Sequence, residues 1–309
     1  MIIAKVIVAL SLLLPTITSA NSLLVKVPGT AISMNSPEGF TLSDSFTGFE
    51  SLDTSSSILI AELPKEAFPQ LKMLFSNLKI ARQGFAARGV HISKLQTVEV
   101  GTTTIPLLSG VQEVQGIVIN KYVALLHGDS TVLVTYNILN DKEFSSNNVV
   151  ESLGSIVIGS EIKVSDKAKS LSFKFKEVPP FKLADIMAGS SAILTTFDGV
   201  DPTGDRPIVV IGNSLSSSST DDIELFSEQL LRSVSGFKTS KIINSSPVKF
   251  AGLDGYKMLA TYTDKTIIQY VGIKNDGQYI RLLSTGSSQE IKESEGAIEL
   301  IAESTAFVR

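Results

Sequence analysis

His127, Asp129 and Ser130 lie within four positions of each other in a chain that has two histidines and no cysteine. Serine hydrolases use these residue types, with an imidazole as the base for the hydroxyl and a carboxylate that orients the imidazole. A catalytic triad gathers its residues from separate elements, however, whereas these three share the short segment LLHGDSTVLV, 125–134. The chain also lacks the Gly-x-Ser-x-Gly elbow of another hydrolase class. We therefore interpret the segment as a turn and predict no catalytic residue and no enzyme activity.

A second copy of this turn supports the interpretation. An offset of about 148 positions places LLHGDSTVLV on IKNDGQYIRL, 273–282. Asn275, Asp276 and Gly277 between two alternating apolar runs form a strong hairpin signal, because these residues tolerate positive φ. We expect His-Gly-Asp to turn the chain in the same way, with its side chains in water.

The remaining candidates for chemistry are metal ligands. His91 has no carboxylate close to it in the sequence, and zinc needs three or four ligands from Cys, His and carboxylates. Calcium prefers carboxylate oxygens, and the loop FDGVDPTGDRP (197–207) contains Asp198, Asp201 and Asp205. The loop departs from EF-hand spacing and lacks its closing glutamate, and Asp, Gly and Pro also make ordinary loops. We predict no metal site and no cofactor, with a calcium-dependent factor kept as an alternative.

The first residues, MIIAKVIVALSLLLPTITSA, have the order of a secretory signal peptide: one lysine, a short apolar run, then small residues. The apolar run is about half the length that a spanning helix needs. We expect residues 1–20 to be cleaved and the mature chain to be periplasmic or secreted, with no membrane insertion. The net charge of −4 falls by one unit when Lys5 is removed. Without basic clusters, the chain is not expected to bind nucleic acid.

The elements that must position any site occur in the same order in both halves. Residues 55–78 and 205–230 each give a β-branched run, a polar break and an amphipathic helix containing Leu-Phe-Ser. The pattern predicts one long helix in the first half and, in the second, a helix capped by Thr220 with Phe226 and Leu230 facing the core. Three or four strands follow in each half, then closing helices at 147–158 and 287–304. The last helix opens with a capping box, Ser287 to Glu290.

This repetition predicts an internal duplication. We assign a first domain to residues 21–160 and a second to residues 171–309, joined by the polar, aperiodic linker 161–170. The fold class is α+β: two tandem domains with α/β/α layers, each an antiparallel sheet flanked by helices. Without disulfides, both domains depend on their apolar cores for stability.

Each half resembles the PsbP-like or Mog-type fold. The resemblance rests on EGFTLSDSFTGF (38–49), SSILIAELP (56–64) and the hairpin around Tyr122, with PPFKLADIMAGSSAILTTF (179–197), RPIVVIG (206–212) and 256–283 in the second half. That superfamily includes photosystem subunits, a Ran-binding nuclear factor and envelope proteins related to DcrB. It implies mostly non-catalytic, accessory roles, and no family site residue can be carried over.

Together these patterns predict an exported, non-enzymatic binding or accessory protein of the cell envelope, whose partner is another envelope protein. The alternative is a calcium-dependent factor or a hydrolase whose site assembles only in three dimensions.

Overall fold

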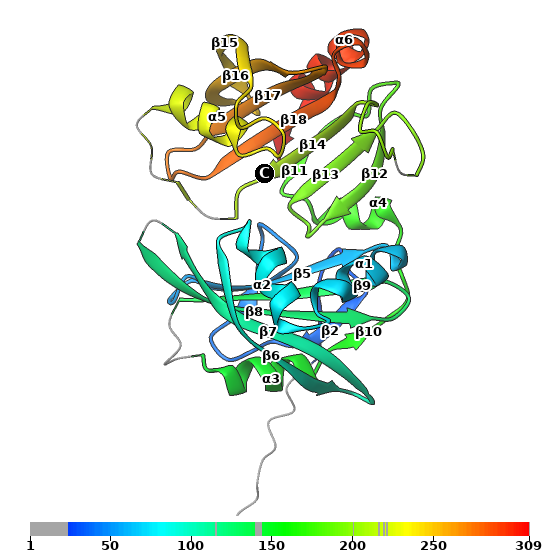
Figure 1. Ribbon diagram of the computed structural model, residues 1–309, viewed down its shortest axis with the longest axis vertical. Helices are drawn as coiled ribbons and strands as arrows, with labels where there is room; N and C mark the ends of the chain where they lie inside the picture. The colour runs from blue at the N-terminus through cyan, green and yellow to red at the C-terminus, as the bar shows by residue number, and fades with distance from the viewer. Residues whose placement is uncertain are drawn as a thin grey trace, which may run out of the picture.

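The computed structural model describes residues 24–114, 116–139, 144–199, 201–215, 217–218, 220 and 222–308. The signal peptide predicted for residues 1–20 lies outside them. None of the described helices has the length and apolar character that a membrane crossing requires. The described chain forms two lobes, one from each half of the sequence, and each is built on a seven-stranded antiparallel sheet (Figure 1).

The first sheet has the strand order β3-β4-β5-β9-β8-β7-β6. Along β5, buried and half-buried residues alternate, as the two-residue period of a strand requires. The strands are β3 (Thr41–Leu42), β4 (Gly48–Ser51), β5 (Ser56–Leu63), β6 (Val90–Val100), β7 (Thr103–Val114), β8 (Ile117–His127) and β9 (Thr131–Ile138).

The second sheet has the order β12-β13-β14-β18-β17-β16-β15, which is the same topology when the strands are counted within each domain. In its interior strand β17, consecutive residues from Thr266 to Gly272 are buried, so both faces of this strand are covered. The strands are β12 (Lys182–Met187), β13 (Ser191–Thr195), β14 (Ile208–Asn213), β15 (Lys241–Phe250), β16 (Leu253–Tyr262), β17 (Lys265–Ile273) and β18 (Tyr279–Ser287).

Helices cover both faces of each sheet, so the predicted α+β class and its layers are confirmed (Figure 1). The first sheet packs against α1 (Phe68–Leu74) and α2 (Leu78–Ala86) on one face and α3 (Ser146–Gly154) on the other. The second packs against α5 (Ile223–Arg232) and, on its other face, α6 (Ser288–Ser304). Short elements complete the lobes: η1 (Lys65–Ala67), η2 (Ala168–Ser170), α4 (Val164–Lys167), β1 (Leu24–Lys26), β2 (Ile32–Asn35), β10 (Val157–Ile158), β11 (Phe173–Lys174) and β19 (Ala306–Phe307).

The helix predicted as one long element in the first half is two helices. Asn77 interrupts it, because its backbone is extended and its side chain accepts the Ile80 N–H as the N-cap of α2. Phe75 at the end of α1 and Phe85 on α2 still face the same core. The closing segment of the first half is likewise shorter than predicted, since α3 ends at Gly154 and the chain continues into β10.

In the second half the N-cap of α5 is Asp222 rather than Thr220. The Asp222 carboxylate accepts the Leu225 N–H, while Thr220 hydrogen-bonds to the backbone of Asp222. The helix is also rotated from the predicted face, since Ser227 and Leu231 are its buried residues. The cap predicted for the last helix is present, with the Ser287 side chain accepting the Glu290 N–H.

The lobes contact each other directly. The Thr47 N–H donates to the Ala188 carbonyl at 2.8 Å, and the Asn213 amide donates to the Ser45 carbonyl at 3.2 Å. Gly189 has φ +60°, and a Cβ there would lie 2.9 Å from the Thr47 nitrogen, so this close approach requires glycine.

The segment predicted as an aperiodic linker is largely structured. Residues 164–170 form α4 and η2, and Val164 and Ala168 pack against the second core. Lys167 is buried, with its ammonium 3.7 Å from the Asp185 carboxylate on β12. The segment therefore packs as part of the second lobe, and the domain boundaries themselves stay a prediction.

Candidate functional site

The His127 segment is the predicted turn. β8 ends at His127, β9 begins at Thr131, and the Gly128 N–H donates to the Ser130 carbonyl at 2.9 Å. The exposed imidazole stacks on Phe68 at 4.0 Å between ring centroids. One expectation is wrong, because Ser130 is buried and its hydroxyl has no hydrogen-bond partner in the described chain. The imidazole is exposed and stacks on Phe68, whereas the Ser130 hydroxyl is buried and forms no hydrogen bond with it. The turn therefore lacks the base–hydroxyl hydrogen bond of a triad.

The two equivalent turns use different backbone geometry. Gly277 has φ +83°, and a Cβ there would lie 2.4 Å from the Ser218 carbonyl oxygen. Gly128 is not among the residues with positive φ, so the prediction that the first turn works in the same way is wrong. The first turn is closed instead by the hydrogen bond from the Gly128 N–H to the Ser130 carbonyl.

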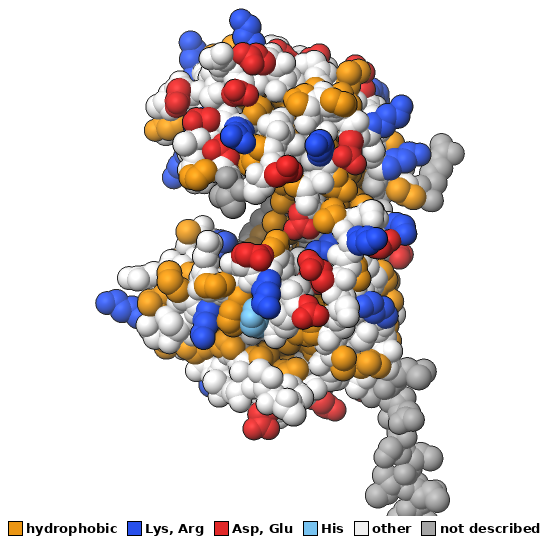
Figure 2. Space-filling view, turned by 90° about the vertical axis from the view of Figure 1, so that its right-hand side faces the viewer, with side chains coloured by type: hydrophobic (Ala, Val, Ile, Leu, Met, Phe, Trp, Pro, Cys, Tyr) orange, Lys and Arg blue, Asp and Glu red, His pale blue; other side chains and the backbone are white. Residues whose placement is uncertain are grey.

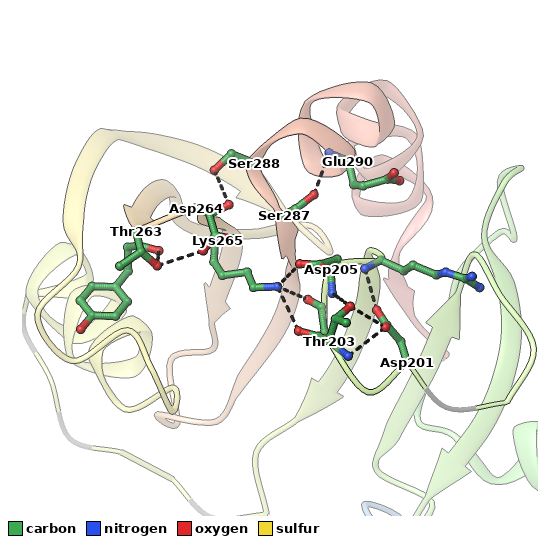
Figure 3. A network of polar contacts seen from close by, with 12 residues as sticks. Asp201, Thr203, Asp205, Thr263, Asp264, Lys265, Ser287, Ser288 and Glu290 are labelled. Atoms are coloured by element: carbon green, nitrogen blue, oxygen red, sulfur yellow. Dashed lines mark hydrogen bonds and ion pairs between the residues drawn. The ribbon is translucent and has the colours of Figure 1, made fainter.

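The acidic loop is built around a lysine from a neighbouring hairpin (Figure 3). The Lys265 ammonium donates to the Asp205 carboxylate at 2.5 Å and to the carbonyls of Thr203 at 3.2 Å and Gly204 at 2.9 Å. These are hard oxygen ligands of the kind that calcium prefers, but a cationic side chain already lies among them. The hydrogen bond from Lys265 lowers the pKa of Asp205.

The other two aspartates of the loop do not join this cluster. Asp201 accepts the Arg206 N–H at 2.8 Å, which lowers its pKa, and also bonds Thr203 (Figure 3). Asp198 is exposed. His91 is exposed on β6. Across the ranges that the structure describes, no three His, Cys, Asp or Glu side chains are placed to hold a metal ion. The contacts of the loop therefore attach it to Lys265 at the start of β17.

A mainly apolar cavity of about 330 Å³ opens on the helical face of the first sheet. The cavity lies where the chain passes from α1 to α2, and Asn77 separates the two helices with an extended backbone. We define the first-domain groove by the residues that line it: Leu71, Leu74, Phe75, Phe85, Arg88, Val90, Gln112, Lys121, Val123, Leu133 and Thr135.

Lys121 is the unusual residue of the groove. Its ammonium donates to the Asn137 side-chain oxygen at 2.5 Å, and no described carboxylate forms an ion pair with it. Burial lowers its pKa, since a partly desolvated cation loses hydration. An anionic group entering the groove would supply the missing opposite charge.

The equivalent position of the second domain is filled. Gln269 lies 148 residues after Lys121 on the matching strand, is fully buried, and donates its amide to the Ser227 carbonyl of α5 at 2.7 Å. Arg281 on the adjacent strand donates to the Leu230 carbonyl at 3.0 Å. These two bonds hold α5 directly on the sheet and explain why α5 turns Ser227 toward it.

The β7–β8 hairpin presents a second apolar feature. We define the hairpin tip by Val111, Val114, Ile117 and Val118, whose side chains are 40–54% exposed. The matching β16–β17 tip of the second domain has Lys265 in place of Ile117, and that lysine braces the acidic loop. Val114 and Ile117 are directly paired and share one face of the hairpin, while Val111 and Val118 lie on its other face. Neighbouring exposed apolar side chains such as Val114 and Ile117 are typical of interaction sites.

Sequence reasoning missed both features. The signal for the groove was a lysine amid the apolar strand residues of IVINKYVALL, 117–126, aligned with a glutamine in the second half. On the face shown in Figure 2, Lys, Arg, Asp and Glu side chains are interspersed over both lobes.

The chain is a two-domain α+β protein. The first domain has an open groove at the position that Gln269 and α5 fill in the second domain. No model of a protein family matches it, and no curated protein sequence matches it. Three solved structures are similar at low TM-score. LpqN of Mycobacterium tuberculosis, described as involved in cell envelope biogenesis, is 16% identical over 44% of this chain and 83% of its own, with a TM-score of 0.36.

The second is the cyanobacterial PsbP of Synechocystis sp. PCC 6803, which is 12% identical over 44% of this chain and 87% of its own, at a TM-score of 0.33. The third is a chain of the Tle4–Tli4 complex, 12% identical over 92% of this chain and 97% of its own, at a TM-score of 0.31. The structural neighbours thus include a cyanobacterial PsbP and a protein described as involved in cell envelope biogenesis. Similarity at this level carries no argument about function, and membership of the PsbP-like family stays a prediction.

Proposed function

We propose that the chain is an exported, non-enzymatic accessory protein that binds another protein of the cell envelope. In this proposal the chain consists of two duplicated PsbP-like domains, and the first domain binds the partner. In the second domain, Lys265 and Gln269 occupy the equivalent positions and form hydrogen bonds within the domain.

The matching topology of the sheets supports the duplication. Both sheets have one strand order, and both edge strands carry an irregularity at the same place, between Ile92 and Lys94 in β6 and between Ile242 and Asn244 in β15. Bulges are conserved features of related sheets, so a shared bulge is expected from a common origin.

The hairpin tip is the observation that carries the binding role. Its four apolar side chains are exposed at the end of two long paired strands, whereas the second domain places Lys265 at the matching position. Burying such side chains against an apolar recess of a partner would release about 25 cal/mol for each Å² removed from water.

The alternatives have no comparable support. The candidate calcium loop has Lys265 among its oxygens, and the imidazole of His127 stacks on Phe68 while the Ser130 hydroxyl is buried. The proposal therefore assigns the chain no catalytic role.

Affinity purification from envelope extracts tests the binding role. The bait is the mature chain, compared with a Val114→Ser/Ile117→Ser variant and with Tyr262→Ser as the matched control on the other hairpin. We expect one envelope protein to be recovered with the wild type and the control and lost with the double variant. Equal recovery with all three baits would contradict a role for the tip.

Export is tested separately. Mass spectrometry of the chain from the extracytoplasmic fraction should find Asn21 at the N-terminus. Recovery of an intact chain beginning at Met1 in the cytosol would contradict export while leaving the binding test unaffected.

A further inference from the structure

We propose that the first-domain groove binds a medium-chain fatty carboxylate, with the carboxylate on Lys121 and the alkyl chain between α1, α2 and the sheet. This inference concerns a small molecule and is independent of the proposed protein partner.

The charge at the floor of the groove selects the head group. The Lys121 ammonium is half-buried, and its described hydrogen-bond acceptor is the neutral amide of Asn137. A buried cation without an opposite charge is unfavourable, and a hydrogen bond between two charged groups is about twice as strong as one between neutral groups. The other cation of the lining, Arg88, is exposed and lies over the Phe85 ring, so the half-buried Lys121 ammonium is the one that lacks hydration. A carboxylate, which is negatively charged at neutral pH, matches it.

The walls of the groove select the body of the ligand. Most of them are apolar side chains of α1, of α2 and of the sheet, such as Leu71, Phe85 and Val123. Arg88, Gln112 and Thr135 are the polar lining residues besides Lys121. A group the size of a water molecule occupies about 30 Å³, so a cavity of this volume holds roughly eleven such groups. That is the size of an alkyl chain of about ten to twelve carbons.

The second domain is the internal comparison. There the position of Lys121 is taken by Gln269, whose amide bonds the backbone of α5, so the same face of the sheet is closed by its own helix. The groove therefore follows from a difference at one strand position together with the break between α1 and α2.

Calorimetric titration of the mature chain with dodecanoate and dodecanol tests the proposal without any variant. We expect dodecanoate to bind saturably and about 10- to 100-fold more tightly than dodecanol, as expected for one hydrogen bond to a charged group. Octanoate should bind at least tenfold more weakly than dodecanoate, since each buried methylene contributes about fourfold. Absence of saturable binding by dodecanoate, or equal affinity for dodecanoate and dodecanol, overturns the proposal.

Two variants locate the site. Lys121→Gln, which introduces the residue of the second domain, should lower the affinity for dodecanoate to that for dodecanol and leave dodecanol binding unchanged. Lys79→Gln removes an exposed charge from α2 and should change neither affinity. If Lys121→Gln, shown to be folded by circular dichroism, binds dodecanoate as the wild type does, the assignment of Lys121 is wrong.

Discussion

Tyr136 and Ser152 form a buried hydrogen bond that joins the first sheet to α3. Removing the Ser152 hydroxyl should destabilise the protein more than removing the Tyr136 hydroxyl. Tyr136 is fully buried, and its hydroxyl lies 2.7 Å from that of Ser152. Because the Ser152 hydroxyl also donates to the Val149 carbonyl at 3.0 Å, it can accept the proton of Tyr136 at the same time. Burial raises the pKa of Tyr136, so the phenol remains protonated over the working range of pH.

The two single variants differ in whether a buried hydroxyl is left without a hydrogen-bond partner. Ser152→Ala leaves the tyrosine hydroxyl buried without a partner, which should lower the free energy of unfolding by about 1–3 kcal/mol. Tyr136→Phe removes that hydroxyl and leaves Ser152 bonded to Val149, so about 0.5–1.5 kcal/mol should be lost. In the double variant no unpaired phenol remains, and its loss should be close to that of Tyr136→Phe alone.

Urea unfolding followed by far-ultraviolet circular dichroism measures these differences, with the transition of the first domain fitted separately where two transitions are resolved. Ser146→Ala is the matched control, because this exposed serine of α3 should change the stability by no more than about 0.5 kcal/mol. Simple addition of the two single effects in the double variant, or a smaller loss for Ser152→Ala than for Tyr136→Phe, would refute the reasoning.

Three further predictions concern the turns, the loop and the junction. Gly277→Ala should lower the free energy of unfolding by about 1–3 kcal/mol, because of its positive φ and the nearby Ser218 carbonyl, whereas Gly128→Ala should be within about 0.5 kcal/mol of the wild type; equal losses in urea unfolding would contradict the assigned geometries. Lys265→Met should lower the melting temperature only slightly, since the ion pair with Asp205 is exposed, and calcium should not raise the melting temperature of the wild type; a rise with calcium would show that the ion displaces the lysine. Limited trypsin digestion should cut after the exposed Lys163 and spare the buried Lys167; the reverse order would contradict the packing of α4 on the second lobe.

The strands and hairpins could be predicted from the sequence because their signals are local. The alternation along β5 and the Asn-Asp-Gly turn before β18 each depend on a few neighbouring residues. The apolar spacing continues across Asn77 and therefore predicts one helix through this position. The break depends on whether its side chain caps the next turn, and apolar spacing does not report this.

The candidate site could be predicted only in part for a different reason. Lys121 stands out among the apolar residues of 117–126, but its type alone does not show whether its side chain lies in a cavity or in water. The cavity above it results from the separation of α1 and α2, which is a tertiary property. The same applies to Lys265, whose place among the oxygens of a loop some 60 residues earlier required the three-dimensional structure.

In the function that we propose, the first domain presents its hairpin tip to a partner in the envelope and the second domain does not. Site-specific photocrosslinking in intact cells tests it most directly, with a photoreactive residue at Ile117 in one strain and at Tyr262 in another. We expect one discrete crosslinked protein from position 117 and none from position 262. The same crosslinks from both positions, or none from position 117 in an exported and folded chain, would contradict it.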